Sequence, residues 1–302
     1  MNPYDCLIVG GGIAGLQAAI QLGRYQYRVL VIDSHAGRSV ICKSYHNILG
    51  WPDGVSGETL RHLGIQHALK YHVSFVQDTV LSLTQDKDVQ RATTATGTVY
   101  TAKAVLLATG LTDHIPEIAG IYPCLGISIY VCPDCDGYEV RGKQTAVLGS
   151  GDAGAGLALA LRHWTDQIVY MNHGGQKVQQ KLQQSMQEQN ISYIEGSIHE
   201  IDTSAPGILC GIRLADGAYI GAERAFVAFG GNEVHSKLAE QAGIRLNEKK
   251  HIIVNPRTKE TSVPNIWAAG DLADHSQQVT IAMGDGAQAA IWIHKRLAGL
   301  DA

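Results

Sequence analysis

Residues 6–15 read CLIVGGGIAG, a short apolar run that leads into a glycine-rich turn. A helical pattern rich in alanine and leucine follows over residues 13–25, and a second apolar run over residues 28–32 ends in Asp33. This order of strand, glycine turn, helix, strand and acid predicts a β-α-β unit of about thirty residues.

The glycines of this turn have the spacing Gly-x-Gly-x-x-Gly, at Gly10, Gly12 and Gly15. The first glycine makes the tight turn, the second lets the backbone approach a pyrophosphate, and the third lets the helix close on the strand. Because the motif follows a strand and opens a helix, we predict that these glycines bind a dinucleotide and that Asp33 holds a ribose hydroxyl.

A second unit of the same kind lies in the middle of the chain. Residues 145–148 are apolar and lead into GSGDAG at 149–154, an alanine- and leucine-rich helix and a strand over 167–171. Other strands run into glycine turns at residues 104–110, 226–231 and 265–271, and residues 284–297 resemble a C-terminal helix. The sequence therefore predicts an α/β fold with two Rossmann-like, three-layer nucleotide-binding domains.

Asp271 ends the last of these strand-to-glycine segments, which reads NIWAAGD. An acid in this position is expected at the carboxyl edge of a parallel sheet, where the ligands of such sheets bind. Taken with the N-terminal glycine motif, this makes Asp271 a further candidate for the cofactor site.

Residues 131–138 read VCPDCDGY, with Cys132 and Cys135 separated by two residues and Asp136 directly after them. A zinc site would need a second spaced pair of ligands, and the other cysteines stand alone. Two cysteines at this spacing form a reducible small-ring disulfide, and an adjacent carboxylate could pass a proton to the leaving thiolate. We therefore predict a redox-active CxxC couple without a metal, in which these three residues are catalytic.

The overall composition restricts the classes of partner. The six cysteines are spread through 302 residues, which favours a reducing compartment. A formal net charge of −4 offers no basic surface to nucleic acid or anionic lipid. The chain has no apolar run of membrane-spanning length and no signal-like start. We expect a cytoplasmic protein without nucleic-acid or membrane partners.

In their order and spacing, the N-terminal glycine motif, the CxxC-Asp-Gly segment, the second glycine turn and the final Gly-Asp resemble those of the low-molecular-weight thioredoxin reductases. The resemblance covers essentially the whole chain and implies the FAD/NAD(P) disulfide reductase fold. It implies a discontinuous FAD-binding domain, residues 1–112 and 231–302, and an inserted NAD(P)-like domain, residues 113–230, that carries the CxxC. It also implies a homodimeric flavoprotein with FAD as cofactor.

The resemblance assigns further residues to the cofactor. Asp33 takes the place of the ribose-binding glutamate, and Asp271 would bind the ribityl chain. Gln278 and Asn47 fall where the family places side chains beside the flavin. The other residues that we expect at the FAD are Gly10, Gly12, Ala14, Gly15, Gly110 and Val279.

The resemblance also gives each cysteine a role. Cys135 would face the flavin, Cys132 would exchange with the substrate, and Asp136 would be the acid. Electrons would then pass between FAD and this couple and on to a thioredoxin-like protein or a small disulfide. The expected intermediate is a mixed disulfide through Cys132.

One departure from the family disfavours NAD(P)H as the reductant. Members that use NADPH carry an arginine cluster after the second strand of the inserted domain, where residues 170–177 here read YMNHGGQK. Without arginine the 2′-phosphate has no bidentate donors, and an acid for the ribose of NADH is missing too.

Relatives that lack this site imply two alternatives for the path of the electrons. Some resemble thioredoxin reductases that take electrons from ferredoxin or another protein donor. Others are dithiol oxidases, in which a dithiol reduces the couple and O₂ is the final acceptor. Asp136 is the reductase-like choice, whereas residues 162–174 are more similar to the oxidase type. The remaining alternatives are a conventional NAD(P)H-dependent reductase and a non-enzymatic flavin redox sensor, which would have no use for Asp136.

Overall fold

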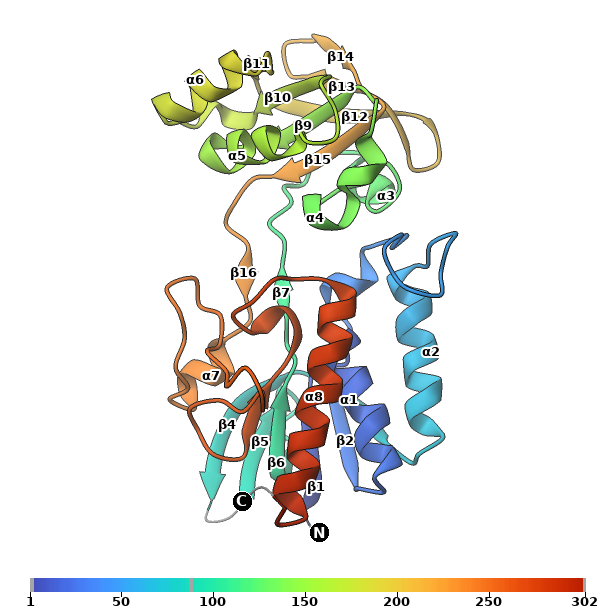
Figure 1. Ribbon diagram of the computed structural model, residues 1–302, viewed down its shortest axis with the longest axis vertical. Coiled ribbons are helices and arrows are strands. Elements are labelled where there is room, and N and C mark those ends of the chain that lie inside the picture. The colour runs from blue at the N-terminus through green and yellow to red at the C-terminus, as the bar shows by residue number, and fades with distance from the viewer. Residues whose placement is uncertain (1–2, 87–88, 301–302) are drawn as a thin grey trace. The chain divides into compact units, whose positions relative to one another are not determined.

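The computed structural model describes residues 3–86 and 89–300, and their contacts divide the chain into two compact units (Figure 1). Unit 1 comprises Met1–Val40, Gly57–Thr112 and Glu233–Ala302, and unit 2 comprises Ile41–Ser56 and Asp113–Asn232. The division predicted from the sequence differs because it placed residues 41–56 and 231–232 in the FAD-binding domain. Residues 1–2, 87–88 and 301–302 of the predicted FAD-binding domain lie outside the described residues.

Segment 41–56 belongs to unit 2 because its backbone packs there. The Lys43 N–H donates to the Leu125 carbonyl at 3.4 Å, and Ile41 packs against the core of unit 2. Gly126 has a φ of +74°, and a Cβ there would lie 2.6 Å from the Lys43 nitrogen. A glycine is therefore needed at position 126 for the segment to approach so closely.

Unit 1 is built on a seven-stranded sheet. Its strands are β1 (Tyr4–Val9), β2 (Val29–Asp33), β3 (Ser74–Gln77), β4 (Val80–Asp86), β5 (Val89–Thr94), β6 (Val99–Leu107) and β17 (Ile266–Ala268). The order is β3-β2-β1-β6-β5-β4, with β17 also paired to β6. β1, β2, β3, β6 and β17 are parallel, whereas β4 and β5 pair antiparallel. A separate short pair joins β7 (Leu111–Thr112) to β16 (Glu233–Val234).

The helices of unit 1 are α1 (Ile13–Arg24), α2 (Gly57–Leu69), α7 (Lys237–Gln241) and α8 (Val279–Leu297), with 3₁₀ turns η1 (Arg38–Val40) and η4 (Gly270–Leu272). Alternate residues of β1 face opposite sides of the sheet. Ile8 joins a core with Leu22 of α1 and Ile293 of α8, whereas Leu7 joins one with Leu83 of β4 and Leu238 of α7. Helices therefore cover one face of the parallel strands. The antiparallel strands β4 and β5, which continue the sheet from β6, pack with α7 against the other face.

The C-terminal helix is longer than predicted. We expected it over residues 284–297, but α8 begins at Val279 and runs through Gly284 and Gly286. A Cβ at Gly286 would collide with the Ala14 carbonyl of α1, so this glycine lets two helices pack closely and does not mark a helix start. In Figure 1, α1 and α8 lie side by side.

Unit 2 repeats this architecture. Its parallel sheet has the order β11-β10-β9-β15-β8, and a second sheet has the antiparallel order β12-β13-β14. The strands are β8 (Ile129–Tyr130), β9 (Thr145–Gly149), β10 (Ile168–Asn172), β11 (Ser192–Glu195), β12 (Ile198–Ala205), β13 (Ile208–Leu214), β14 (Tyr219–Gly221) and β15 (Arg224–Ala228). The helical segments are α3 (Ile121–Cys124), α4 (Pro133–Asp136), η2 (Gly137–Val140), α5 (Gly151–Leu161), η3 (His173–Gly175) and α6 (Gln180–Glu188).

The layers of unit 2 match those of unit 1. Val147 of β9 packs with Ala158 of α5 and Met186 of α6, whereas Leu148 packs with Ile201 of β12 and Ile212 of β13. Each unit is thus a parallel sheet with helices on one face and antiparallel strands on the other. The predicted α/β class with two Rossmann-like, three-layer domains is confirmed.

Candidate functional site

The first glycine turn joins β1 to α1. Gly10 has a φ of +105°, and a Cβ there would strike the Ala108 carbonyl of the strand end beside it. A Cβ at Gly15 would strike the Gly10 carbonyl. Packing therefore explains these two glycines. Gly12 differs, because a Cβ there would have no atom within 4 Å, and it stands at the N-terminal end of α1.

Ala14 brings the two ends of the chain together at this turn. It is buried in α1, and its Cβ lies against Gly270, where a new Cβ would come within 2.9 Å of it. Gly270 has a φ of +77° and directly precedes Asp271. The N-terminal glycine motif and the C-terminal Gly-Asp motif, which are about 260 residues apart in sequence, are therefore neighbours in unit 1.

Asp33 lies at the end of β2 and is held by two partners. Its Oδ1 accepts a hydrogen bond from the Gly11 N–H at 2.9 Å, and its Oδ2 lies 2.6 Å from Nη2 of Arg61. Arg61 also donates from Nη1 to the Gly11 carbonyl at 2.9 Å. Its side chain is only 3% exposed, and its Nε is buried without a hydrogen-bond partner among the described residues.

Sequence reasoning missed Arg61. It lies in α2, which carries no motif, and the one available signal was an arginine on the side of the helix that faces the protein. A buried guanidinium donor without a protein acceptor has room for a further partner, which can be a water molecule or a ligand. This orphaned donor beside the open Gly12 turn fits an anionic ligand such as a dinucleotide.

Asp271 lies in η4 and forms an ion pair with Arg38, with 3.0 Å between Oδ2 and Nη1. The same Nη1 donates to the Gln277 side-chain carbonyl at 3.0 Å. Gln278 caps the N-terminus of α8, and Val279 is the first residue of that helix. Arg38 and Gln277 were not predicted, because the sequence does not indicate that η1 lies beside the Gly-Asp turn.

Gly110 follows β6 with a φ of +64° and open space around its Cβ position. Its carbonyl accepts the His235 N–H at 3.0 Å. β6 is parallel to β1 and β17, so Gly110 leaves the sheet at the same edge as Gly10 and Asp271.

Nine of the predicted cofactor residues therefore lie in unit 1, at or near the carboxyl ends of its parallel strands, where dinucleotides bind in such folds. They are Gly10, Gly12, Ala14, Gly15, Asp33, Gly110, Asp271, Gln278 and Val279. The first turn of α1, residues 13–16, carries no acidic side chain to oppose a pyrophosphate. With the open Gly12 position and the orphaned Arg61 Nε, the residues present fit FAD.

Asn47, the tenth predicted cofactor residue, lies elsewhere. It is exposed on segment 41–56, which groups with unit 2, whereas we expected it in the same domain as the N-terminal glycine motif. Its role beside the flavin stays a prediction.

The predicted redox couple lies in unit 2. Cys132 and Cys135 form a disulfide across the first turn of α4, with 5.3 Å between their Cα atoms. The Asp136 N–H donates to the Cys132 carbonyl at 3.0 Å, and Asp136 is only 8% exposed. A Cβ at Gly137 would lie 2.7 Å from the Trp164 ring, so this glycine allows the turn to pack on the tryptophan that follows α5. The three predicted catalytic residues share one compact turn.

The second glycine turn, Gly149-x-Gly151-x-x-Gly154, differs from the first. A Cβ at Gly151, the counterpart of Gly12, would lie 3.3 Å from the Lys177 carbonyl and 3.4 Å from the Gln176 side chain. Asp152, in the first turn of α5, accepts hydrogen bonds from the Gln179 backbone at 2.8 Å and side chain at 2.5 Å. The chain itself therefore covers this turn and places a carboxylate there.

A small cavity of about 220 Å³ lies beside the second turn. It is lined by residues of β15, α5 and the neighbouring loops, among them Val131, Ala153, Leu157, Ala228 and Gly230. Its volume is below the ~300–1,000 Å³ of typical small-molecule sites.

Within residues 3–86 and 89–300, no group of three or more His, Cys, Asp or Glu side chains could hold a metal ion. No helix in the same part of the chain is both long and apolar enough to cross a membrane.

Comparison with known proteins gives consistent results. A family model described as "Pyridine nucleotide-disulphide oxidoreductase" matches residues 4–286. The chain is 29% identical over 296 residues to the thioredoxin reductase of Treponema pallidum, covering 95% of each protein. It is 28% identical over 305 residues to the bifunctional thioredoxin reductase/thioredoxin of Mycobacterium leprae, covering 98% of this chain and 66% of that protein. The structure of the putative thioredoxin reductase TrxB from Bacillus anthracis matches with a TM-score of 0.84 at 26% identity, covering 98% of this chain and 99% of that one.

Proposed function

We propose that this chain, a member of the pyridine nucleotide-disulphide oxidoreductase family, passes electrons between FAD and the Cys132–Cys135 couple without using NADPH. The chain is a thioredoxin reductase-like, flavin-dependent disulfide oxidoreductase. The observation that carries the proposed role of the Cys132–Cys135 couple is their disulfide, which lies in the turn that also holds the buried Asp136. We further propose that the enzyme is a cytoplasmic homodimer.

The chemistry at the couple follows from the three residues in that turn. FAD, when bound, supplies a two-electron carrier. Two electrons and one proton open the disulfide to a thiol at Cys135 and a thiolate at Cys132, and we assign Asp136, the next residue in the chain, as the donor of that proton. The Cys132 thiolate then attacks a substrate disulfide and forms a mixed disulfide. Attack by Cys135 on Cys132 releases the substrate as a dithiol and restores the starting bond.

The partner in this exchange is a thioredoxin-like protein or a small disulfide. Exchange requires only that a thiolate reach a disulfide sulfur, so the reaction runs in either direction according to the relative potentials. Relatives named thioredoxin reductase support a thioredoxin-like partner.

Features of unit 2 support independence from NADPH. Gln176 and Lys177 cover Gly151, the glycine at which a pyrophosphate would approach. The Asp152 carboxylate lies in the first turn of α5, where it would repel a bound phosphate. The segment after β10 offers no arginine to a 2′-phosphate.

We therefore expect NADPH to reduce the flavin at least ~100-fold more slowly than a productive dithiol does, because its phosphates lack donors and meet a carboxylate. The measurement is anaerobic rapid mixing followed by visible absorbance, with NADPH, NADH, reduced ferredoxin and a dithiol as reductants. Dithionite reduction of the same sample is the control for a competent flavin. Rapid bleaching at micromolar NADPH would overturn this part of the proposal.

A dithiol oxidase that passes electrons to O₂ is the second candidate, and the sequence of residues 162–174 favours it. Oxygen consumption with a dithiol substrate separates the two. An oxidase consumes one O₂ for each dithiol oxidised to a disulfide, with hydrogen peroxide as product. A reductase reduces its disulfide partner when supplied with reduced ferredoxin or another protein donor.

A further inference from the structure

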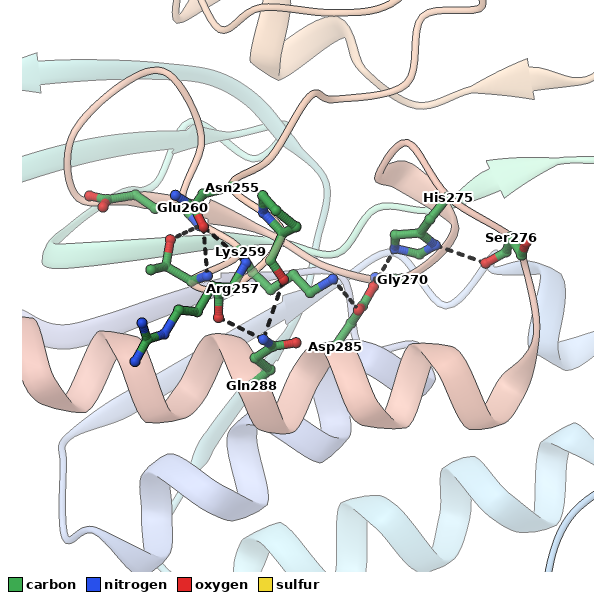
Figure 2. A network of polar contacts seen from close by, with 11 residues as sticks. Asn255, Arg257, Lys259, Glu260, Gly270, His275, Ser276, Asp285 and Gln288 are labelled. Atoms are coloured by element: carbon green, nitrogen blue, oxygen red, sulfur yellow. Dashed lines mark hydrogen bonds and ion pairs between the residues drawn. The ribbon is translucent and has the colours of Figure 1, made fainter.

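Asp285 is a buried carboxylate in α8 that ties three segments of unit 1 together. Its side chain is 6% exposed. Oδ1 lies 2.8 Å from Nζ of Lys259, and Oδ2 accepts from the Gly270 N–H at 3.1 Å and from Nε2 of His275 at 2.5 Å. Figure 2 shows Lys259 and His275 reaching Asp285 from opposite sides. One side chain thus joins α8 to the Gly-Asp turn and to the loop over residues 255–260.

The two contacts of the His275 ring favour its protonated form. Nε2 faces the Asp285 carboxylate, and Nδ1 faces the Ser276 carbonyl at 2.8 Å. Both partners are acceptors, and a neutral imidazole has only one N–H to donate. The hydrogen bond to Asp285 raises the pKa of His275. Burial would raise the pKa of Asp285, but the hydrogen bonds from His275 and Lys259 outweigh it and lower that pKa.

Lys259 is held in an unfavourable position for a lysine. It is only 9% exposed, and its φ of +61° lies in the left-handed region that residues with a Cβ seldom adopt. The backbone N–H of Lys259 donates to the Asn255 carbonyl at 2.8 Å, and the side-chain amide of Gln288 in α8 donates to the Arg257 backbone carbonyl at 2.6 Å (Figure 2). These hydrogen bonds hold the 255–260 loop against α8, where the Lys259 ammonium forms its ion pair with Asp285.

The Asp285 network holds the segment that carries the predicted flavin-binding residues. Gly270 and His275 are both bonded to Asp285, and Asp271 lies between them in sequence. Gln278 follows three residues after His275 and caps α8. Arg38 adds a further tie through Asp271.

We infer that Asp285 and His275 are positioning residues that hold segment 270–278 in shape for FAD and make the affinity for FAD depend on the protonation of His275. The inference rests on the proposed FAD site. The charged groups that face His275 are Asp285 from α8 and Lys259 from the 255–260 loop. The other acids of the segment have partners of their own, Asp271 with Arg38 and Asp274 with the Asn247 amide.

The direction of the pH dependence follows from the charge on His275. Its ordinary pKa is 6.5, and the folded protein raises it. The contribution of the His275–Asp285 pair to the ordered form of segment 270–278 is therefore complete below that ordinary value and is lost as the pH rises through the raised pKa. Asp285, whose pKa is lowered, remains ionised over the same range. Because FAD would bind that ordered form, FAD affinity should weaken as the pH rises above 6.5 through the raised pKa of His275.

The test is titration of FAD into the full-length apoprotein between about pH 6 and about pH 8.5, followed by flavin fluorescence. For the wild type we expect the dissociation constant to rise several-fold across this range. Asp285→Asn should weaken binding ~10-fold near pH 6 and flatten the pH profile. His275→Gln, whose amide can still donate to Asp285, should give a flat profile near the alkaline wild-type value.

Asp5→Asn is the matched control. The Asp5 carboxylate also joins a lysine, Lys103 at 2.7 Å, to a backbone N–H, that of Arg28 at 2.9 Å. It lies five residues before Gly10 on an extended strand, which is about 16 Å from the turn. This variant should keep the wild-type affinity and pH profile even if its stability falls.

Asp285→Asn leaves the buried Lys259 ammonium unpaired, so Asp285→Asn/Lys259→Met is the second variant, with the same flat profile expected. If the wild type does not bind FAD, the proposed function is wrong. If the wild type binds FAD and the Asp285 and His275 variants keep its pH profile, the inference alone is overturned.

Discussion

Replacing Cys135 with serine is expected to lower turnover at least ~1,000-fold, since disulfide exchange cannot proceed when one of its two sulfurs is removed. FAD should remain bound, because the residues that fit it lie in unit 1, whereas the Cys132–Cys135 disulfide lies in unit 2. The measurements are turnover with a dithiol in air, turnover with a disulfide partner and a chemical reductant, and flavin content by absorbance.

Cys132→Ser should lower turnover to the same extent but differ in its spectrum. It leaves Cys135 as a free thiolate, and we predict a long-wavelength absorbance band from contact of that thiolate with the flavin. If Cys135→Ser shows the band and Cys132→Ser does not, the two cysteines have exchanged roles.

Cys42→Ser is the control for both variants. Cys42 is a half-buried cysteine of the same unit that takes no part in the disulfide, and its thiol donates to the Ser44 carbonyl at 3.3 Å, a bond that a serine hydroxyl can replace. We expect its turnover to stay within about twofold of wild type. Turnover within tenfold of wild type for either couple variant would refute a CxxC mechanism.

Gly12→Ala is expected to weaken FAD binding at least ~100-fold, or about 2.7 kcal/mol, while the apoprotein still folds. The backbone of Gly12 is extended, with φ −75° and ψ −170°, and a Cβ there meets no protein atom within 4 Å. The methyl group therefore costs the protein little but occupies the space through which a pyrophosphate would approach. The measurements are FAD titration of the apoprotein and its thermal unfolding.

Gly156→Ala is the matched control for this variant. Gly156 lies in α5 of unit 2, and a Cβ there also meets nothing within 4 Å. Alanine should raise stability by up to about 1 kcal/mol through its helix propensity and leave FAD affinity unchanged. Wild-type affinity in Gly12→Ala would mean that the cofactor does not use the first glycine turn.

Much of the fold could be predicted because the signals were local. The apolar run before Gly10, the glycine spacing and the acid after the second run all lie within one β-α-β unit, and the structure has that unit as β1, α1 and β2. The repeat of the pattern at Gly149 likewise marked β9, α5 and β10. The start of α8 was misplaced because Gly284 was taken as its first residue, whereas α8 begins at Val279 and runs through Gly284 and Gly286.

The candidate site was only partly predictable. Glycine and acid positions were found because they belong to motifs, but Arg61, Arg38 and Asp285 belong to none. Each of them meets a motif residue from a segment that is distant in the chain. Which helix or loop supplies such a partner depends on how the elements pack, and no local pattern encodes that.

The amino-acid sequence by itself determined that this protein has two dinucleotide-type units and a paired cysteine in the second, because strand period, glycine spacing and CxxC spacing are short-range properties. Only the tertiary structure decided how these motifs are used. It left Gly12 open and covered Gly151 with Gln176 and Lys177, although the two turns have the same spacing. It also gathered Lys259, His275 and the Gly270 N–H around the buried Asp285 carboxylate. Whether a turn is open and whether a charge is paired depend on which distant segments lie against it, and that is settled only when the chain folds.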